Sequence, residues 1–467
     1  MKESIKTFVL LTLSISLIFL ASLVWVKFPK KPESPSVNGS EFSSTYLERE
    51  ILSPKKLIVN FSHGEHTLFY EIEPMWKEYY NWMEDFLVLL GDEDNQIEKI
   101  TQEEYLKAQD EMSLVFVYDY PWSTRILGNL LNVEKPKEKN TGAFKIETLY
   151  LPVKGGFIIL INENKELIKV SIKHGKFQEI EERLEDLYDS KRYRNYENFW
   201  EKYKVLTNVY VPKLTVTLPR PVIYRNELAK MEKTYRNDLA ERFLGRDIDY
   251  IREIIEDSGT TYVYEARNLR FHDDGLIEYQ NLEEFESKEE NLFVSLQTAL
   301  DFIATRTGIN TGLVLSQVER ISTKGNSGYR LDFNLKENDK EVLLQKDPLE
   351  HYMSIEVYNQ NVAKFQFLYR KAMDTNAPKD PAAPILEDQA FSPSGVLEQN
   401  VPMFYPNGTP DGDVLLELIQ RVEDVDVIYV DPGREEEMTT LLPAWKIKMD
   451  TGTYIFHMGN GEFLMER

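Results

Sequence analysis

Residues 8–26 form an uncharged, mostly apolar run that limits what this chain can be more than any other feature. The run is close to the roughly 20 residues that an α-helix needs to cross the hydrocarbon core of a bilayer. Lysines flank it on both sides, and Trp25 lies where an interfacial aromatic residue is expected. The sequence therefore predicts an N-terminal transmembrane anchor followed by a large water-soluble region.

A cleaved signal peptide is the alternative interpretation of the same run. The apolar core of a signal peptide usually has roughly 7–15 residues and ends in small residues of the Ala-x-Ala type. Here the run continues to Val26, and Leu20 and Ser22 make a poor cleavage pair. We therefore expect a retained anchor in the cell membrane. The lysines on its two sides nearly balance, and we favour the N-terminus in the cytoplasm with the large region outside it.

The composition argues against some partners and sites. Acidic residues outnumber basic ones by 78 to 55, and the net charge of −23 would repel nucleic-acid phosphates and an anionic membrane surface. The chain has no cysteine, which suits an exported protein and removes thiol nucleophiles and thiolate metal sites. We expect no nucleic-acid partner.

The chain after the anchor is too long for one ordinary domain. Proline, serine and glycine are frequent just after the anchor, as in a flexible spacer, and a Pro/Ala-rich stretch interrupts the chain at 377–384. The predicted units are a cytoplasmic stub with the anchor (1–29), a stalk (30–56), an N-terminal α+β domain (57–212), a central α+β domain (213–386) and a C-terminal αβββ domain (387–467).

Hydrophobic periodicity predicts an α+β fold of mostly antiparallel sheets with packed helices. Helices are predicted at 75–90, 226–244, 293–305 and 414–422. Strands are predicted first at 57–59, 114–118, 145–151, 157–161, 167–172, 214–218, 260–264 and 275–279. An order of one helix and three strands then occurs twice, with strands at 314–321, 328–335 and 353–357 and again at 426–430, 444–449 and 453–458. These two stretches are either related modules or a chance similarity.

The usual local motifs of enzymes are missing: there is no Gly-x-Ser-x-Gly, no phosphate-binding glycine loop and no His-Glu-x-x-His. A carboxylate-based hydrolase remains an alternative, because two acids that are distant in sequence can meet in a fold.

His63 and His66 follow a strand and enclose a glycine, which is more typical of a polar turn than of a metal site. The acidic stretch from Asp92 has Ile97 where a calcium loop needs glycine. Residues 272–275 are typical of a hairpin turn. We predict no catalytic residue, metal or cofactor.

Small or weakly polar residues recur on one face of the predicted anchor. They are Ser4, Thr7, Ser14 and Ala21. Such residues let a neighbouring transmembrane helix approach closely, although they are also common in membrane anchors that have no such neighbour. They define a candidate helix interface.

Three sets of residues carry a resemblance to a known family. They are Leu149, Tyr150 and Pro152 in the first domain, Tyr262 and Tyr279 in the central one, and Pro443 and Trp445 before the last hairpin. In this order, behind a single N-terminal anchor, the chain resembles the YycH (WalH) family. These are membrane-anchored accessory proteins of the WalK/WalR (YycG/YycF) two-component system, which controls cell-wall homeostasis. The last set also resembles the sister protein YycI.

The resemblance implies regulation without catalysis. The outer domains would bind a YycI-like protein and a WalK-like sensor histidine kinase, and the transmembrane helices would pack together. The chain departs from the family pattern after Tyr262, where a turn is expected, and in the longer insertion near 377–384. A membrane-anchored envelope hydrolase and a passive assembly scaffold are the alternatives.

Overall fold

The structure is a computed structural model that describes most of residues 44–467. It leaves undescribed residues 63, 71–82, 84–85, 89, 91–94, 131–144, 155, 173–177, 206–207, 214–215, 229–230, 288–289, 324, 346–348, 374–388, 407–412 and 434–436. The predicted anchor, with Ser4, Thr7, Ser14 and Ala21, lies outside the described residues, as does most of the predicted helix at 75–90. Within the described part, no helix is long and apolar enough to cross a membrane.

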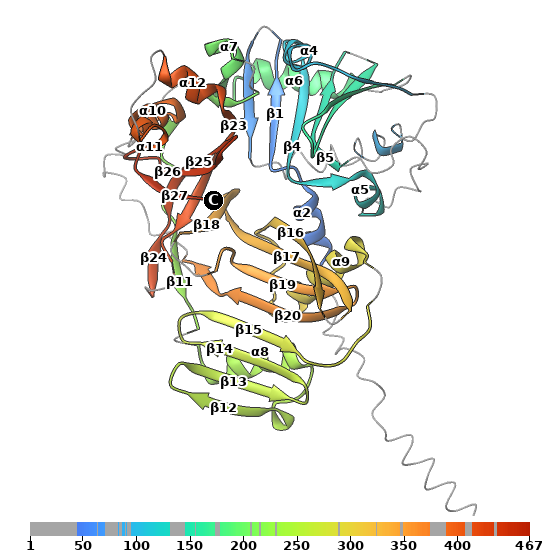
Figure 1. Ribbon diagram of the computed structural model, residues 1–467, viewed down its shortest axis with the longest axis vertical. Coiled ribbons are helices and arrows are strands. Elements are labelled where there is room, and N and C mark those ends of the chain that lie inside the picture. Colours follow the sequence, from blue (N-terminus) through green and yellow to red (C-terminus); the bar gives the residue numbers. More distant parts are fainter. Residues whose placement is uncertain are drawn as a thin grey trace, which may run out of the picture.

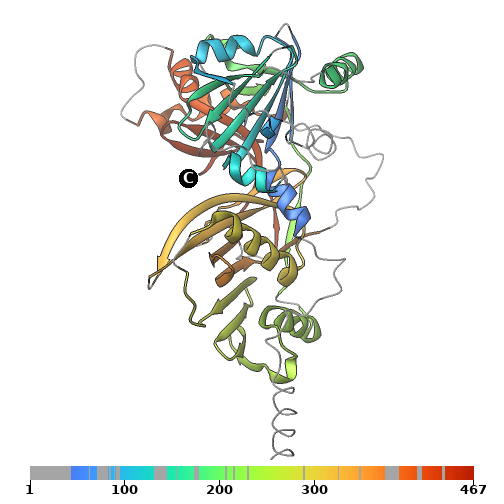
Figure 2. The same ribbon diagram turned by 90° about the vertical axis from the view of Figure 1, so that its right-hand side faces the viewer.

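The fold is mixed α+β with mostly antiparallel sheets, as the periodicity predicted. Figures 1 and 2 show an elongated molecule, with one large sheet at one end and a second sheet through the middle and the other end. The last strands of the chain run alongside both parts (Figure 1).

The N-terminal unit is a nine-stranded antiparallel sheet of order β3-β7-β6-β5-β4-β1-β2-β8-β9. Its strands are β1 (Lys56–Asn60), β2 (His66–Phe69), β3 (Gln96–Lys99), β4 (Ser113–Ser123), β5 (Lys145–Pro152), β6 (Phe157–Asn162), β7 (Leu167–Ser171), β8 (Asn195–Asn198) and β9 (Tyr210–Pro212). Its helices are α4 (Gln102–Ala108), α5 (Thr124–Leu130), α6 (Gln178–Ser190) and α7 (Phe199–Tyr203). Leu57 and Val59 face the main core, whereas Ile58 faces a second, smaller cluster, because successive strand residues point to opposite faces.

A 13-stranded sheet is the second large sheet of the described molecule. Its central strands are β12 (Arg252–Glu256), β13 (Gly259–Tyr264), β14 (Arg267–His272), β15 (Leu276–Asn281), β16 (Leu313–Thr323), β17 (Asn326–Glu337), β18 (Lys340–Leu344), β19 (Met353–Tyr358) and β20 (Asn361–Leu368). It continues into the C-terminal strands β23 (Val422–Asp431), β25 (Leu442–Met449), β26 (Gly452–His457) and β27 (Phe463–Glu466). All described pairings in this sheet are antiparallel except β18 with β23.

Two helices cover one face of the central strands: α8 (Lys233–Leu244) and α9 (Leu292–Thr307). The Asn291 side chain accepts a hydrogen bond from the Val294 N–H at the start of α9, and Gly308 ends the helix in the left-handed conformation. Between these caps, α9 buries Leu296, Leu300 and other apolar residues against the sheet. Capping and one apolar face together explain why this segment is a helix.

Shorter elements complete the fold. The helices are α2 (Thr45–Leu52), α10 (Pro393–Gln399), α11 (Val401–Phe404), α12 (Val414–Gln420) and the 3₁₀ turn η1 (Ile248–Tyr250). The two small sheets pair β10 (Val216–Thr217) with β22 (Gln389–Ala390), and β11 (Ile223–Asn226) with β21 (Arg370–Ala372) and β24 (Met438–Thr440).

Several sequence-based boundaries need correction. Part of the predicted stalk, Thr45–Leu52, is the helix α2, whose Leu47 is fully buried and which packs on α9 and β16. The helix predicted at 226–244 begins at Lys233, because residues 223–226 form a strand instead. Residues 272–275 form the predicted hairpin turn between β14 and β15.

The predicted order of one helix and three strands is present, but each such unit has four meandering strands. Helix α9 precedes β16, β17, β19 and β20, with β18 as an added arm of β17. Helix α12 precedes β23, β25, β26 and β27. A third unit, unnoticed in the sequence, is α8 with β12, β13, β14 and β15.

Candidate functional site

On one edge of β23, no described strand pairs with its first half, and side chains contact the backbone there instead. The parallel strand β18 pairs with β23 only at Tyr429, Val430 and Asp431. Before that point, the Val427 N–H donates to the Tyr70 hydroxyl at 3.3 Å, and Lys56 Nζ donates to the Val425 carbonyl at 3.4 Å. These polar side chains join the N-terminal unit to the C-terminal strands, beside a buried apolar cluster in which Val209 and Val211 pack with Trp445.

Four charged residues form this connection, and we call them the ionic junction: Lys55, Lys56, Asp424 and Asp426. Lys56 Nζ lies 2.9 Å from Asp426 Oδ1, and Lys55 Nζ lies 3.0 Å from Asp424 Oδ2. Each lysine also contacts the other carboxylate. Lys55 directly precedes β1, Lys56 is its first residue, and the aspartates are two residues apart on β23. The junction therefore brings together segments that are far apart in the chain.

A further ion pair extends the junction into the central strands. Lys446 Nζ on β25 lies 2.6 Å from Glu341 Oε2 on β18. The Asn334 amide donates to Glu341 Oε1 at 2.8 Å. Three parts of the fold therefore meet through charged and polar side chains.

Mutual pairing keeps these groups charged. Burial by itself would lower the pKa of Lys55, but Asp424 and Asp426 outweigh it and hold that pKa well above its usual range. Burial would raise the pKa of Asp424, but Lys55 and Lys56 hold it well below its usual range. Burial would also raise the pKa of Glu341, yet Lys446 and Asn334 lower it to about 2. Lys55, Asp424 and Glu341 are thus ionised at neutral pH.

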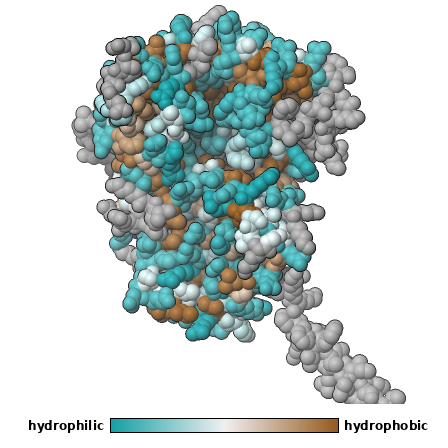
Figure 3. Space-filling model, in the orientation of Figure 1, coloured by the Kyte–Doolittle hydropathy of each residue, from teal (hydrophilic) through white to brown (hydrophobic). Residues whose placement is uncertain are grey.

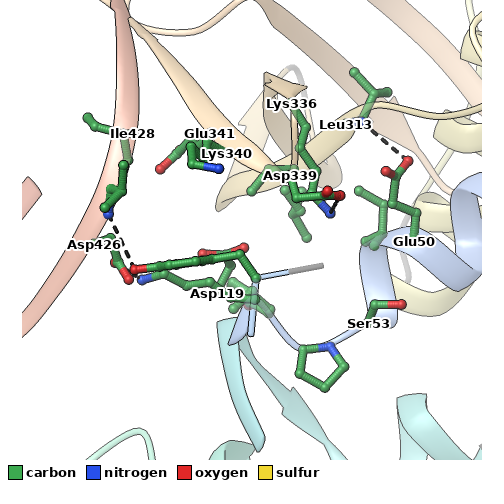
Figure 4. A pocket seen from close by; sticks show the side chains of 18 residues that line it. Glu50, Ser53, Asp119, Leu313, Lys336, Asp339, Lys340, Glu341, Asp426 and Ile428 are labelled. Carbon is green, nitrogen blue, oxygen red and sulfur yellow. Dashed lines mark hydrogen bonds and ion pairs between the residues drawn. The ribbon is translucent and has the colours of Figure 1, made fainter. Parts of the chain in front are cut away.

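A small cavity of about 40 Å³ lies beside the ionic junction. Figure 4 shows carboxylates of Asp119, Asp426 and Glu341 around it, and Glu50 at its far side. Desolvation raises the pKa of Asp119 to about 6, with Lys55 acting in the opposite direction. Asp119 is nevertheless an exposed residue, so water screens its charge and its effect on stability is small.

Helix α2 is fixed at the same cavity. Glu50 accepts hydrogen bonds from the N–H groups of Gly312, at 2.7 Å, and Leu313, at 3.4 Å. These bonds fasten the segment before the N-terminal unit to the start of β16.

A larger cleft of about 560 Å³ opens on the other side of the ionic junction. Its floor is the smaller-cluster face of the N-terminal sheet, with Ile58, Leu68, Val117, Ile161 and Leu167. Its opposite wall is the start of β23 and the end of β25. The volume lies within the range of roughly 300–1,000 Å³ that is usual for ligand pockets.

Charges on the cleft rim are paired within the protein. Lys165 pairs with Glu147 on the N-terminal side. On the opposite wall, Arg421 Nε lies 2.9 Å from Asp450 Oδ1, and Lys448 Nζ lies 3.4 Å from Glu423 Oε2. The rim therefore presents both signs together, and the apolar floor distinguishes the cleft from its surroundings.

The sequence suggested that His66 belongs to a polar turn, but His66 lies in a strand. It lies in strand β2 and is 2% exposed, with Nδ1 2.8 Å from Asn60 Oδ1 and Nε2 3.1 Å from Glu201 Oε1. Tyr210 also donates to Asn60 at 3.1 Å. His63 lies outside the described residues. Among the described residues, no group of three His, Asp or Glu side chains could hold a metal ion.

The residues that carried the family resemblance are not brought together. Leu149, Tyr150 and Pro152 lie in β5, Tyr262 in β13, Tyr279 in β15, and Pro443 and Trp445 in β25. Of these, Leu149, Tyr150, Tyr262, Tyr279 and Trp445 are buried hydrophobic residues. Trp445 Nε1–H donates to the Phe391 carbonyl at 2.8 Å, and the Tyr150 hydroxyl donates to the Ala108 carbonyl at 2.5 Å. Their observed contacts belong to core packing.

The ionic junction was missed in the sequence, although a signal was present. Asp424 and Asp426 alternate with valines in a strongly apolar strand, so they share one face of a buried element. Buried aspartates require partners. Lys55 and Lys56 directly before another apolar strand were candidate partners, but nothing in the sequence connects two segments so far apart.

Comparisons with known proteins do not assign this chain to a family. No family model matches the chain, and no curated protein matches it. Among solved structures, it is similar to an uncharacterised protein from Eubacterium rectale ATCC 33656, at 11% identity and a TM-score of 0.35, covering 56% of this chain and 91% of that one. It is also similar to the C-terminal domain of Bacillus megaterium YpeB, at 11% identity and a TM-score of 0.25, covering 51% and 97%. Neither likeness carries an argument about fold or function.

Proposed function

We propose that this chain is a non-enzymatic, membrane-anchored regulatory protein whose outer domains bind partner proteins and thereby act on a sensor histidine kinase. The observation that carries the proposal is the ionic junction, which joins the N-terminal unit to the C-terminal strands beside an open cleft. Polar contacts between domains permit relative motion more readily than apolar ones, and the ionic junction is the polar part of an interface that also contains the apolar cluster around Val211 and Trp445. A regulator without catalysis needs such a movable element.

The mechanism follows from the position of the cleft. One wall belongs to the N-terminal unit and the other to β23 and β25, with Lys56 and Asp424 of the ionic junction in the lining, so we expect a change in the junction to alter the width of the cleft. A partner that binds one width better than the other shifts the protein toward that state. A transmembrane anchor would carry this shift to a YycI-like protein and a WalK-like kinase, which are the partners implied by the family resemblance.

An envelope hydrolase is the second candidate, and one observation bears on it. Asp119 and Glu341 line the same cavity and have pKa values of about 6 and about 2, a contrast typical of an acid and a base in glycoside hydrolysis. That cavity of about 40 Å³ has room for only a few water molecules, far less than a sugar ring needs. Glu341 is also engaged by Lys446 and Asn334. This favours the binding function.

The proposal is tested first by association. The full chain is expressed with an affinity tag in its own cells, and the solubilised membrane fraction is purified and probed for a sensor histidine kinase. We expect the kinase to co-purify and its phosphorylation to change when the chain is deleted. Absence of the kinase from the purified material contradicts the proposal.

The second test separates a regulator from a passive scaffold. Replacing Lys56→Met together with Asp426→Leu makes part of the ionic junction apolar and hinders its opening. Reporter output from genes under the kinase should change, with protein level unchanged. The matched control is Lys99→Met with Glu166→Leu, an exposed ion pair remote from the junction. A kinase that co-purifies while output is the same in both variants supports the scaffold.

A further inference from the structure

The strand β12 ends the 13-stranded sheet with an open edge. It pairs with β13 on one side, and no described strand lies on the other. Figure 1 shows it as the outermost strand of the lower end, and Figure 3 shows apolar surface at that end. By contrast, β27 at the other end of the sheet is partly covered, because Gln345 Nε2 donates to the Leu464 carbonyl at 3.0 Å.

The backbone groups that β12 leaves unpaired follow from its hairpin. Asp257 and Ser258 form a two-residue turn, and the flanking residues Glu256 and Gly259 are paired. In such a hairpin the flanking pair exchanges hydrogen bonds and the pattern alternates along the ladder. The N–H and C=O groups of Glu253 and Ile255 therefore point away from β13, and no hydrogen bond within the described chain covers them.

Two large apolar side chains are exposed at this edge, next to the charged residues of the strand. Ile255 is 73% exposed and Tyr250, just before the strand, is 74% exposed. These are the largest exposed fractions of any large hydrophobic side chain in the described part of the chain. Free edges normally carry charges that repel another strand. Here the strand carries charges of both signs, Arg252 and Glu256, which can attract a second strand.

We propose that β12 pairs antiparallel with β12 of a second copy of this chain, with the twofold axis at Ile254. In this register Ile254 faces Ile254 of the second copy, and Arg252 faces Glu256 of the second copy. Glu253 and Ile255 supply the outward backbone groups that such a pair needs. In this register the outward backbone groups form hydrogen bonds, and side chains of opposite charge face each other.

Charge complementarity is what favours a second copy over an unrelated strand. Arg252 is exposed and has no ion-pair partner among the described residues. The Glu256 carboxylate lies 3.1 Å from Arg270 of β14, in a solvent-exposed pair that water screens. Antiparallel pairing about Ile254 creates two Arg252–Glu256 contacts, one on each side of the axis. Opposite charges that face each other across strands stabilise a sheet.

The remaining acid at the edge does not oppose this pairing. Glu253 faces Ile255 of the second copy, but its carboxylate is bound by Lys233 at 2.8 Å and lies 3.1 Å from the Tyr262 hydroxyl. Its negative charge is therefore balanced within its own chain. Ile255 would lose much of its exposure to water.

The absence of cysteine makes disulfide trapping a direct test. Ile254→Cys places two thiols on opposite sides of the axis, where facing Cα atoms are about 4.5 Å apart, within the range that a disulfide spans. Asp257→Cys is the matched control, because it lies on the same hairpin and is exposed, but its own counterpart would be about 20 Å away. The full chain in its membrane is oxidised mildly and analysed without reductant.

We expect cross-linked dimer from Ile254→Cys and little from Asp257→Cys. Adding Arg252→Glu to the first variant should reduce the cross-linked fraction by about tenfold at early times, because two attractive pairs become repulsive. Adding Glu256→Arg as well should restore it. The unfolding midpoint of each variant is measured to show that β12 is still formed.

Two results would overturn the pairing. Equal cross-linking of the two cysteine variants shows random collision, and an unchanged yield with Arg252→Glu shows that the register is wrong. Neither result bears on the proposed regulation, which is tested by measuring kinase association. Dimerisation and regulation can therefore fail or hold separately.

Discussion

Lys56 and Asp426 form an ion pair between the first strand of the N-terminal unit and the first C-terminal strand, with 2.9 Å between Nζ and Oδ1. Only 5% and 4% of the two side chains are exposed. Breaking one partner of a buried pair leaves a buried charge, whereas replacing both with apolar residues is often neutral. The pair therefore contributes to the contact between two distant parts of the chain, together with the apolar cluster that they share.

Removing one partner should be costly. We expect Asp426→Ala to lower the free energy of unfolding by about 3 kcal/mol, because Lys56 keeps only Asp424. Replacing Lys56→Met and Asp426→Leu together should recover most of this loss. Urea unfolding gives the values, with the exposed Lys99→Met as control, for which a change below about 1 kcal/mol is expected. An Asp426→Ala protein as stable as that control would show that the pair is not buried in solution.

Acid should weaken the same connection. The pKa of Glu341 is about 2 in the folded protein against an ordinary 4.5, and that of Asp424 is also lowered. Groups with depressed pKa values stabilise the fold above their unfolded pKa, and this stabilisation is lost as pH falls through the folded pKa. Stability should therefore fall from pH 4.5 towards pH 2. Urea midpoints measured across this interval should fall less in Glu341→Gln, and an equal slope would contradict the assignment.

Trp445 should act through the core and not through a partner surface. Trp445→Phe removes the hydrogen bond to the Phe391 carbonyl and should reduce stability by about 1–3 kcal/mol. Trp445→Ala should reduce it by about 3–5 kcal/mol. Kinase association, measured well below the unfolding temperature, should be unchanged in Trp445→Phe. Lost association at full stability would instead place this residue in a partner interface.

His66 should also prove structural. His66→Ala leaves Asn60 with one fewer partner in a buried network and should lower stability by about 1–3 kcal/mol. Elemental analysis of the purified native protein should show no stoichiometric metal. A metal that is present in the native protein and lost in His66→Ala would overturn this interpretation.

The predicted anchor makes a separate prediction about the membrane. Replacing Ser14→Leu and Ala21→Leu should alter kinase reporter output several-fold, because bulky residues keep a neighbouring helix from close approach, at roughly 1 kcal/mol per lost contact. Ser16→Leu with Ser22→Leu is the control, since these residues lie mostly off that face. Membrane insertion and protein level are checked for each. Equal output from the two double variants means that the outer domains alone carry the regulation.

Local patterns in the sequence were enough to find many of the elements. The apolar alternation at 328–335 marks β17, and the helical pattern at 293–305 marks α9. Both elements bury one face against neighbours, so composition and period agree. Within the described residues, the strand predicted at 214–218 is represented by Val216–Thr217, and β18 was not predicted. Short strands depend on the neighbours that pair with them, which a local pattern does not contain.

The sequence by itself determined the α+β class, the excess of acidic charge, the lack of cysteine and the order of helix before strands in the last two units. These properties are local or additive, so they can be read without knowing which segments meet. Only the tertiary structure decided that Lys55 and Lys56 pair with Asp424 and Asp426, and that β12 is left as a free edge. Both depend on contacts between residues far apart in the chain, and the free energy of burying a charge or leaving an edge open is set by those contacts.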